Sequence, residues 1–109
     1  MGLLNSRRND FGVYVKAKTA SQAQKLTDIP NIGPRIADDF RLLRILKPSD
    51  LKGKDPVRLY ERLNQVTGQR HDPCVLDTFM AAVEFMNGGP AKPWWAFTDQ
   101  RKSNYRKST

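Results

Sequence analysis

Apolar residues in the middle of the chain recur every three or four positions, a spacing typical of amphipathic helices. Ile36, Phe40 and Leu43 fall on one helical face in this way. Gly33-Pro34 stands just before them, and proline suits the first position of a helix because its missing N–H would have no acceptor there. The pattern therefore predicts a helix that begins at Pro34.

The pair Asp55-Pro56 repeats this start signal, with the aspartate side chain as the expected N-cap. The apolar residues expected on one face of the helix that follows are Leu59, Leu63 and Val66. Gly68 is the expected stop, since glycine readily adopts the left-handed conformation that ends helices.

Asp72-Pro73 gives the start signal a third time. The apolar positions that follow at helical spacing are Leu76, Phe79, Met80, Val83 and Met86. Gly88-Gly89-Pro90 ends the pattern, so the third helix should lie between these two punctuation points.

Two weaker signals complete the helical pattern. Thr19 and Gln22 have the spacing of a capping box, which predicts a short helix from there to about Asp28. Ser49 is the expected cap of a short turn through Leu51.

The fold class predicted from these signals is all-α, with five short helices between Thr19 and Asn87. The only stretch with strand-like character, Val13–Val15, is too short to found a sheet. The predicted organisation is a flexible basic arm over residues 1–18, a domain over 19–99 and a basic tail over 100–109.

Three large aromatic residues, Trp94, Trp95 and Phe97, follow the last predicted helix. They are expected to fold back over the helical core, with at least one tryptophan buried and one partly exposed. Stacking on unpaired bases is the alternative use of such side chains.

The segment Ile29-Pro30-Asn31-Ile32-Gly33 must reverse the chain direction between two predicted helices. Asn31 and Gly33 tolerate positive φ, and Ile32 between them should point into the core. Such a turn presents backbone N–H groups at the positive end of a helix dipole, which suits a phosphate oxygen.

Composition and charge narrow the class of partner. The chain has 109 residues and one cysteine, Cys74, which fits one domain in a reducing cytoplasm, and no apolar run is long enough for a membrane span. The net charge is +8, and the excess lies in residues 1–25 and 92–109, because residues 26–91 carry equal numbers of acidic and basic side chains. Basic arms on a neutral body favour a polyanionic partner, although solubility alone is an alternative explanation.

The stretch LTDIPNIGPRIA, residues 26–37, resembles a helix-hairpin-helix motif, with Asn31 where that motif usually has its first glycine. The resemblance implies an architecture of the helix-hairpin-helix or SAM-like type and backbone amides that contact DNA phosphates. Those amides would belong to Ile32, Gly33, Arg35 and Ile36. Some motifs of this kind also hold a monovalent cation with turn carbonyls; otherwise no cofactor is expected.

Three further stretches, DPVRLYERL, GQRHDPCVLD and KPWWAFTD, follow in order. Together with the hairpin they resemble the small bacterial pathogenicity-locus family, whose members often carry a mitomycin-resistance label. The resemblance covers residues 26–99. A link to mitomycin would imply a role with damaged or cross-linked DNA.

His71, Asp72 and Cys74 invite a catalytic or metal-site interpretation. A thiol in the first turn of a helix should have a lowered pKa, and a histidine beside it could act as a base. One cysteine and one histidine are too few for a structural zinc site. The favoured interpretation is structural, with Asp72 as cap and Cys74 packed, so no enzyme activity and no metal are predicted.

The predicted function is non-sequence-specific binding of duplex DNA through its phosphate backbone. The predicted DNA-binding residues are Lys25, Asn31, Ile32, Gly33, Arg35 and Ile36. Asp28, Asp38 and Asp39 lie close by in sequence and oppose this interpretation. The alternative is a protein-interaction module that uses the same hairpin or the tryptophan segment.

Overall fold

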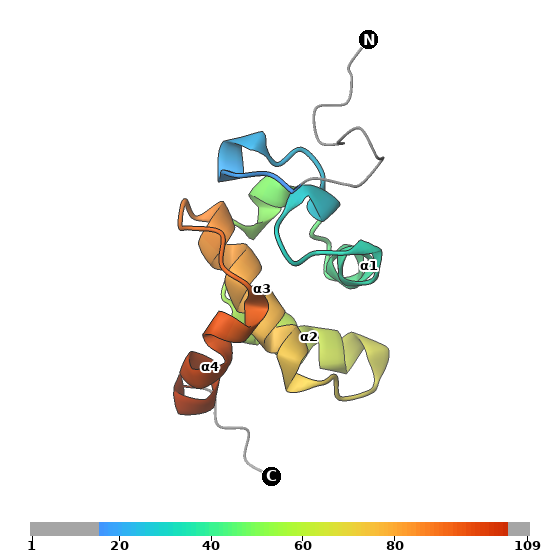
Figure 1. Ribbon diagram of the computed structural model, residues 1–109. Coiled ribbons are helices and arrows are strands. Elements are labelled where there is room, and N and C mark those ends of the chain that lie inside the picture. Colours follow the sequence, from blue (N-terminus) through green and yellow to red (C-terminus); the bar gives the residue numbers. More distant parts are fainter. Residues whose placement is uncertain (1–15, 105–109) are drawn as a thin grey trace.

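Helix α3, Pro73–Met86, runs through the middle of the molecule, and the other elements pack around it (Figure 1). The structure, a computed structural model, describes residues 16–104. Its other elements are the helices α1 (Pro34–Leu42), α2 (Pro56–Thr67) and α4 (Thr98–Asn104) and the 3-10 turns η1 (Ala20–Gln22), η2 (Leu26–Asp28), η3 (Pro48–Leu51) and η4 (Trp94–Phe97). The described range contains no strand, so the all-α prediction is confirmed.

Helix α3 begins as predicted, with the Asp72 carboxylate accepting a hydrogen bond from the Cys74 N–H at 2.8 Å. It is apolar on nearly every side, which is the pattern of a helix buried all round. Its neighbours are α2, α4, η3 and η4. Phe79 stacks on Phe40 of α1 with ring centroids 4.8 Å apart, which ties the hairpin region to the same core.

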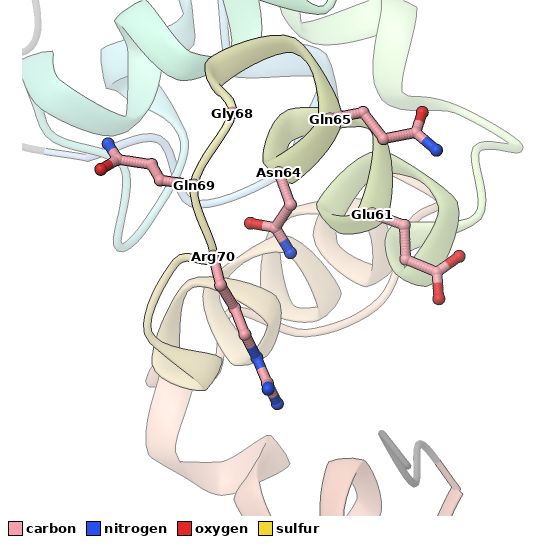
Figure 2. Close-up of a pocket in the computed structure, with 6 residues that line it drawn as sticks. All are labelled: Glu61, Asn64, Gln65, Gly68, Gln69 and Arg70. Carbon is pink, nitrogen blue, oxygen red and sulfur yellow. The ribbon is translucent and has the colours of Figure 1, made fainter. Parts of the chain in front are cut away.

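Helix α2 also begins and ends where the sequence predicts. The Asp55 carboxylate accepts from the Val57 N–H at 2.9 Å, and Gly68 closes the helix with a φ of 70° (Figure 2). The expected face is partly wrong, because Val66 is exposed. The buried residues of α2 are Leu59, Tyr60 and Leu63, so the face that packs on the core is centred towards Tyr60 and away from Val66.

The predicted single helix from Thr19 to Asp28 is wrong. Two 3-10 turns, η1 and η2, replace it, and Thr19 makes no capping bond through its side chain. The Asp28 carboxylate is the physical reason, because its Oδ2 accepts from the N–H groups of Gln24 and Lys25 at 2.8 and 3.1 Å. These bonds hold the backbone at Lys25, between η1 and η2, in an extended conformation.

An aspartate also bonds the backbone that leads into η3. The Asp50 Oδ2 accepts from the N–H groups of Leu46 and Lys47 at 2.9 and 3.2 Å. The predicted cap, Ser49, makes no capping bond, because η3 begins at Pro48 and Ser49 lies inside it, with Lys47 at the N-cap position.

The chain after α3 departs from the predicted layout. Residues 100–104, assigned to the basic tail, continue helix α4. Within residues 16–104 there are four α-helices and four 3-10 turns, so the five-helix count is not confirmed. The predicted flexible arm, residues 1–18, reaches into the described range, where Ala17 is buried and its N–H donates to the Asp28 carbonyl at 2.8 Å. The predictions for Val13–Val15, and for the rest of the arm and residues 105–109, concern residues outside that range.

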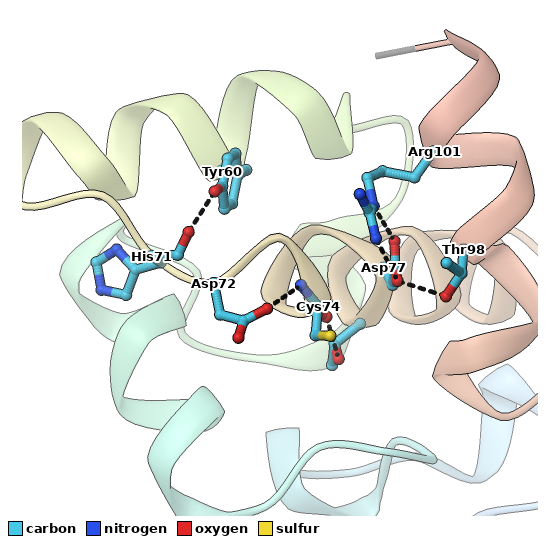
Figure 3. Close-up of polar contacts among 8 residues, drawn as sticks. Tyr60, His71, Asp72, Cys74, Asp77, Thr98 and Arg101 are labelled. Atoms are coloured by element: carbon cyan, nitrogen blue, oxygen red, sulfur yellow. Dashed lines mark hydrogen bonds and ion pairs between the residues drawn. The ribbon is translucent and has the colours of Figure 1, made fainter. Parts of the chain in front are cut away.

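A buried ion pair holds α4 against α3. Asp77 is fully buried in α3, and the Arg101 Nε donates to its Oδ1 at 2.8 Å. The Thr98 hydroxyl donates to the other carboxylate oxygen at 2.7 Å. A buried carboxylate needs such partners, so α4 forms where it can supply them (Figure 3).

Among the helices of residues 16–104, none combines the length and the apolar character that crossing a membrane requires.

Replacing Arg101 with methionine should destabilise the fold by about 3 kcal/mol, because it leaves the Asp77 carboxylate buried without its cation. The measurement is urea unfolding followed by circular dichroism. Lys102→Met is the matched control, because Lys102 is the exposed neighbour on the same helix. Equal losses in the two variants would show that the ion pair is not what holds α4.

Candidate nucleic-acid interface at the hairpin

The hairpin, residues 26–42, consists of η2, a tight turn and α1. Ile29 and Ile32 are fully buried in it, as predicted for Ile32. Asn31 adopts the left-handed conformation with a φ of 75°. Gly33 was the other candidate for positive φ, and that expectation is wrong, because its φ is −92°. Asparagine alone therefore makes this reversal, helped by its tolerance of that region.

The backbone donors at the start of α1 divide into two groups. The Ile32 N–H, one of the predicted phosphate contacts, donates to the Ile29 carbonyl at 3.1 Å and is already used. Within residues 16–104, the N–H groups of Gly33, Arg35 and Ile36 have no hydrogen-bond acceptor. A Cβ placed on Gly33 would meet no atom within 4 Å, so the space above the turn is open.

Two carbonyl groups of the hairpin accept hydrogen bonds from a lysine side chain. The Lys16 ammonium donates to the Thr27 and Ile32 carbonyls at 2.5 and 2.6 Å. Burial lowers the pKa of Lys16, and the neighbouring Asp28 carboxylate acts in the opposite direction. These two carbonyls, where a monovalent cation was considered, therefore already have a cationic partner from the chain itself.

The nearest basic side chains are placed as the sequence suggests. Lys25 is exposed at the start of η2, and Arg35 is exposed in the first turn of α1. Arg35 belongs to the hairpin, and Lys25 directly precedes it on the other side of the turn. Ile36 is half-buried against the core, so it offers its backbone rather than its side chain.

The three aspartates that opposed DNA binding are each partly compensated. Asp28 is buried and holds two backbone N–H groups. Asp38 pairs with Arg41 at 2.6 Å. Burial raises the pKa of Asp39, and the nearby His71 and Arg35 act against that rise. The negative field at the hairpin is therefore weaker than the sequence alone implies.

The Asn31 side chain links the hairpin turn to the tryptophan segment, residues 92–97. Its Nδ2 donates to the Lys92 carbonyl at 2.8 Å, and its Oδ1 accepts from the Trp94 N–H at 3.3 Å. In Figure 1 the orange segment after α3 passes beside the cyan turn. Asn31 is thus a tertiary contact, and no sequence signal could have shown this because its partners lie about sixty positions away.

The aromatic residues of this segment differ from the expectation. Phe97 is buried, Trp94 is half-buried and Trp95 is 63% exposed. The prediction that at least one tryptophan is buried is therefore wrong, because Phe97 fills the core position in its place.

The His71–Cys74 stretch forms a structural corner (Figure 3). The Tyr60 hydroxyl donates a hydrogen bond to the His71 carbonyl, and the Nδ1 of the His71 ring lies 2.8 Å from the Asn64 Oδ1. The predicted lowering of the thiol pKa is wrong: a hydrogen bond to Asp72, together with burial, raises the pKa of Cys74. Within residues 16–104 no cluster of three metal-ligating side chains occurs.

An open hollow of about 570 Å³ lies beside the α2–α3 connection. Figure 2 shows the Gln69 side chain extending to one side of the hollow and those of Glu61 and Gln65 extending to the other. A site for chemistry needs groups that converge on one point, and this hollow does not bring them together.

The sequence profile of the family described as Cdd1, pathogenicity locus, matches residues 19–103. The chain belongs to the pathogenicity-locus family. The mitomycin resistance protein McrB of Streptomyces lavendulae is 45% identical over 84 residues, which cover 77% of this chain and 80% of that protein. No solved structure matches the chain. The family match confirms the resemblance drawn from the motifs and includes both the hairpin and the tryptophan segment.

Replacing Lys16 with methionine should destabilise the fold by about 2 kcal/mol, because the Thr27 and Ile32 carbonyls lose a charged donor. Thermal unfolding measures this effect. Lys18→Met, at an exposed position two residues away, should change the melting temperature little. If the two variants melt together, the ammonium does not support the hairpin.

Cys74 should react slowly with iodoacetamide at neutral pH, because its raised pKa keeps it in the unreactive thiol form. Asp72→Asn removes the carboxylate but keeps a good N-cap, so the thiol pKa should fall and alkylation should speed up. Asp55→Asn, the matching cap of α2, is the control and should not change the rate. A thiol that already labels rapidly in the native protein would contradict the hydrogen bond to Asp72.

Proposed function

We propose that the protein binds DNA without sequence specificity, through the N-terminal end of α1 in the hairpin. The observation that carries the proposal is the open group of backbone donors at Gly33, Arg35 and Ile36. No base-reading side chain is needed for such a contact, because backbone amides hold phosphates and these are the same at every position of a duplex.

The electrostatics of the hairpin support a phosphate at this point. The three N–H groups that have no acceptor in the described part of the chain lie at the positive end of the dipole of α1, a helix of nine residues. Arg35 stands in the same turn and adds a full positive charge. Together they provide an anion site with both directed hydrogen bonds and net charge.

The hairpin is, in this proposal, a helix-hairpin-helix motif in a SAM-like domain whose first helix is reduced to the turn η2. Asn31 takes the place of the usual first glycine, and its side chain points to the tryptophan segment through two hydrogen bonds. A side chain engaged in this way does not stand in front of the phosphate site.

A single hairpin on a body of balanced charge should bind weakly. Non-specific binding at physiological salt has dissociation constants of about 10⁻⁴–10⁻⁶ M. The basic residues at both ends of the chain raise the local attraction for DNA. We therefore propose that the ends supply affinity and the hairpin supplies the position.

We also propose that this binding serves resistance to mitomycin, without enzymatic chemistry. The support is the similarity to a protein that is named for mitomycin resistance. The raised pKa of Cys74 agrees with a non-enzymatic role, because it leaves the chain's one thiol a poor nucleophile.

A protein partner is the second candidate. Leu42 and Leu46, at and just beyond the end of α1, are 57% and 67% exposed. A protein partner could bury these two side chains, since contiguous exposed apolar surface marks protein contacts.

Gly33→Glu tests the proposed function. The new carboxylate has open space and an unstrained backbone, so the fold should survive, while its charge should weaken DNA binding at least tenfold. Binding is measured by fluorescence anisotropy of a labelled duplex over a series of salt concentrations. For the native chain the logarithm of the affinity should fall linearly with that of the salt concentration.

Gly33→Gln is the matched control, because it adds nearly the same volume without charge. It should keep most of the affinity. If the glutamate and glutamine variants bind DNA as the native chain does, the hairpin is not the contact, and the leucines at the end of α1 become the better candidate.

A further inference from the structure

Trp95 is the one aromatic side chain of residues 16–104 that is mainly exposed. The other aromatic residues in that range are buried or half-buried. Leaving an indole in water forgoes the large stabilisation that burying an aromatic side chain brings. The Trp95 indole is therefore available to a partner beyond residues 16–104.

The segment that carries the exposed Trp95 indole is packed against the core. Phe97, two residues later, is buried in the core, and η4 packs against α3. Trp94 meets Trp95 edge to face, with ring centroids 5.6 Å apart and planes at 86°. The Trp94 backbone is bonded in turn to the Asn31 side chain.

The same bonds place the indole near the proposed phosphate site. From Trp95 the path to the turn runs through one peptide unit, the 3.3 Å hydrogen bond and the side chain of Asn31. Adding standard bond lengths up to the Gly33 nitrogen limits the separation of that atom from the Trp95 Cα to about 20 Å. A few nucleotides span this distance, since single-stranded sites on small domains cover about 4–16 nucleotides.

We propose that Trp95 stacks on an unpaired base of the DNA whose backbone the hairpin holds. The inference rests on the proposed function and names its preferred substrate: DNA with single-stranded nucleotides next to a duplex. Bases within a duplex are stacked on one another and hide their flat faces, whereas an unpaired base can offer its face to an aromatic ring.

The segment that carries Trp95 also carries a cation, which favours a nucleic acid over an apolar protein surface as the partner. Lys92 lies in the same segment, with its ammonium 5.5 Å from the centre of the Phe97 ring. Its pair with Glu84, at 3.3 Å, is a partly exposed surface contact and therefore leaves the cation accessible to a phosphate. Proteins that bind single strands combine exposed aromatic rings with cations along the path of the backbone, and this segment carries one of each, Trp95 and Lys92.

The experiment compares two labelled probes by fluorescence anisotropy with the full chain. One is a short blunt duplex, and the other is the same duplex extended by a single-stranded thymidine tail. The native chain should bind the tailed probe about tenfold more tightly, within the range known for stacking of one base on an aromatic side chain. Trp95→Ala should remove this preference and leave the affinity for the blunt duplex unchanged.

Two further variants test whether the aromatic ring of Trp95 itself makes the contact. Trp95→Phe keeps an aromatic face and should retain part of the preference, which a merely structural role of the indole would not explain. In Trp94→Phe the emission of Trp95 can be followed alone among residues 16–104, and the tailed probe should quench it more than the blunt duplex does.

The failure of this inference and of the proposed function are distinguishable. Equal affinity for the two probes, or a preference that survives Trp95→Ala, overturns the stacking while salt-sensitive duplex binding through the hairpin remains. Binding to neither probe overturns both proposals at once, and the exposed indole then belongs to a protein contact.

Discussion

The burial of α3 is the constraint on which the rest of the structure depends. This helix is apolar on nearly every side, so no single neighbour can shield it from water. The chain covers it with α2, α4, η3 and η4, and α1 joins the same core through the Phe40–Phe79 stack. The hairpin and the tryptophan segment are thus both fixed relative to one central helix, which allows them to form one surface.

Polar side chains organise the connections between these elements. Asp28 and Asp50 each satisfy two backbone N–H groups, and Asp77 anchors α4 through Arg101. The bonds of Asp28 and Asp77 offset the cost of burying polar groups, whereas those of Asp50 lie at the surface. The amides of Gly33, Arg35 and Ile36 differ, because no acceptor within residues 16–104 bonds them. They lie at the surface, where an anion from outside can meet them.

The proposed function and the further inference describe two parts of one contact surface. The hairpin offers donors for a phosphate, and the tryptophan segment offers an aromatic face, with Asn31 hydrogen-bonded between them. Two weak contacts strengthen one another when their spacing lets both engage the same ligand at once. The Lys16 ammonium helps to fix this spacing by holding the hairpin carbonyls.

The sequence by itself determined the all-α class, the family and the helices that begin at Pro34, Pro56 and Pro73. Their start signals act within a few residues, because an aspartate or proline at the N-terminus shapes only its own turn. Tertiary structure alone decided that Asn31 binds the tryptophan segment, and that residues 98–104 form a helix against Asp77. Those outcomes depend on pairing between residues far apart in sequence, which local propensity does not encode.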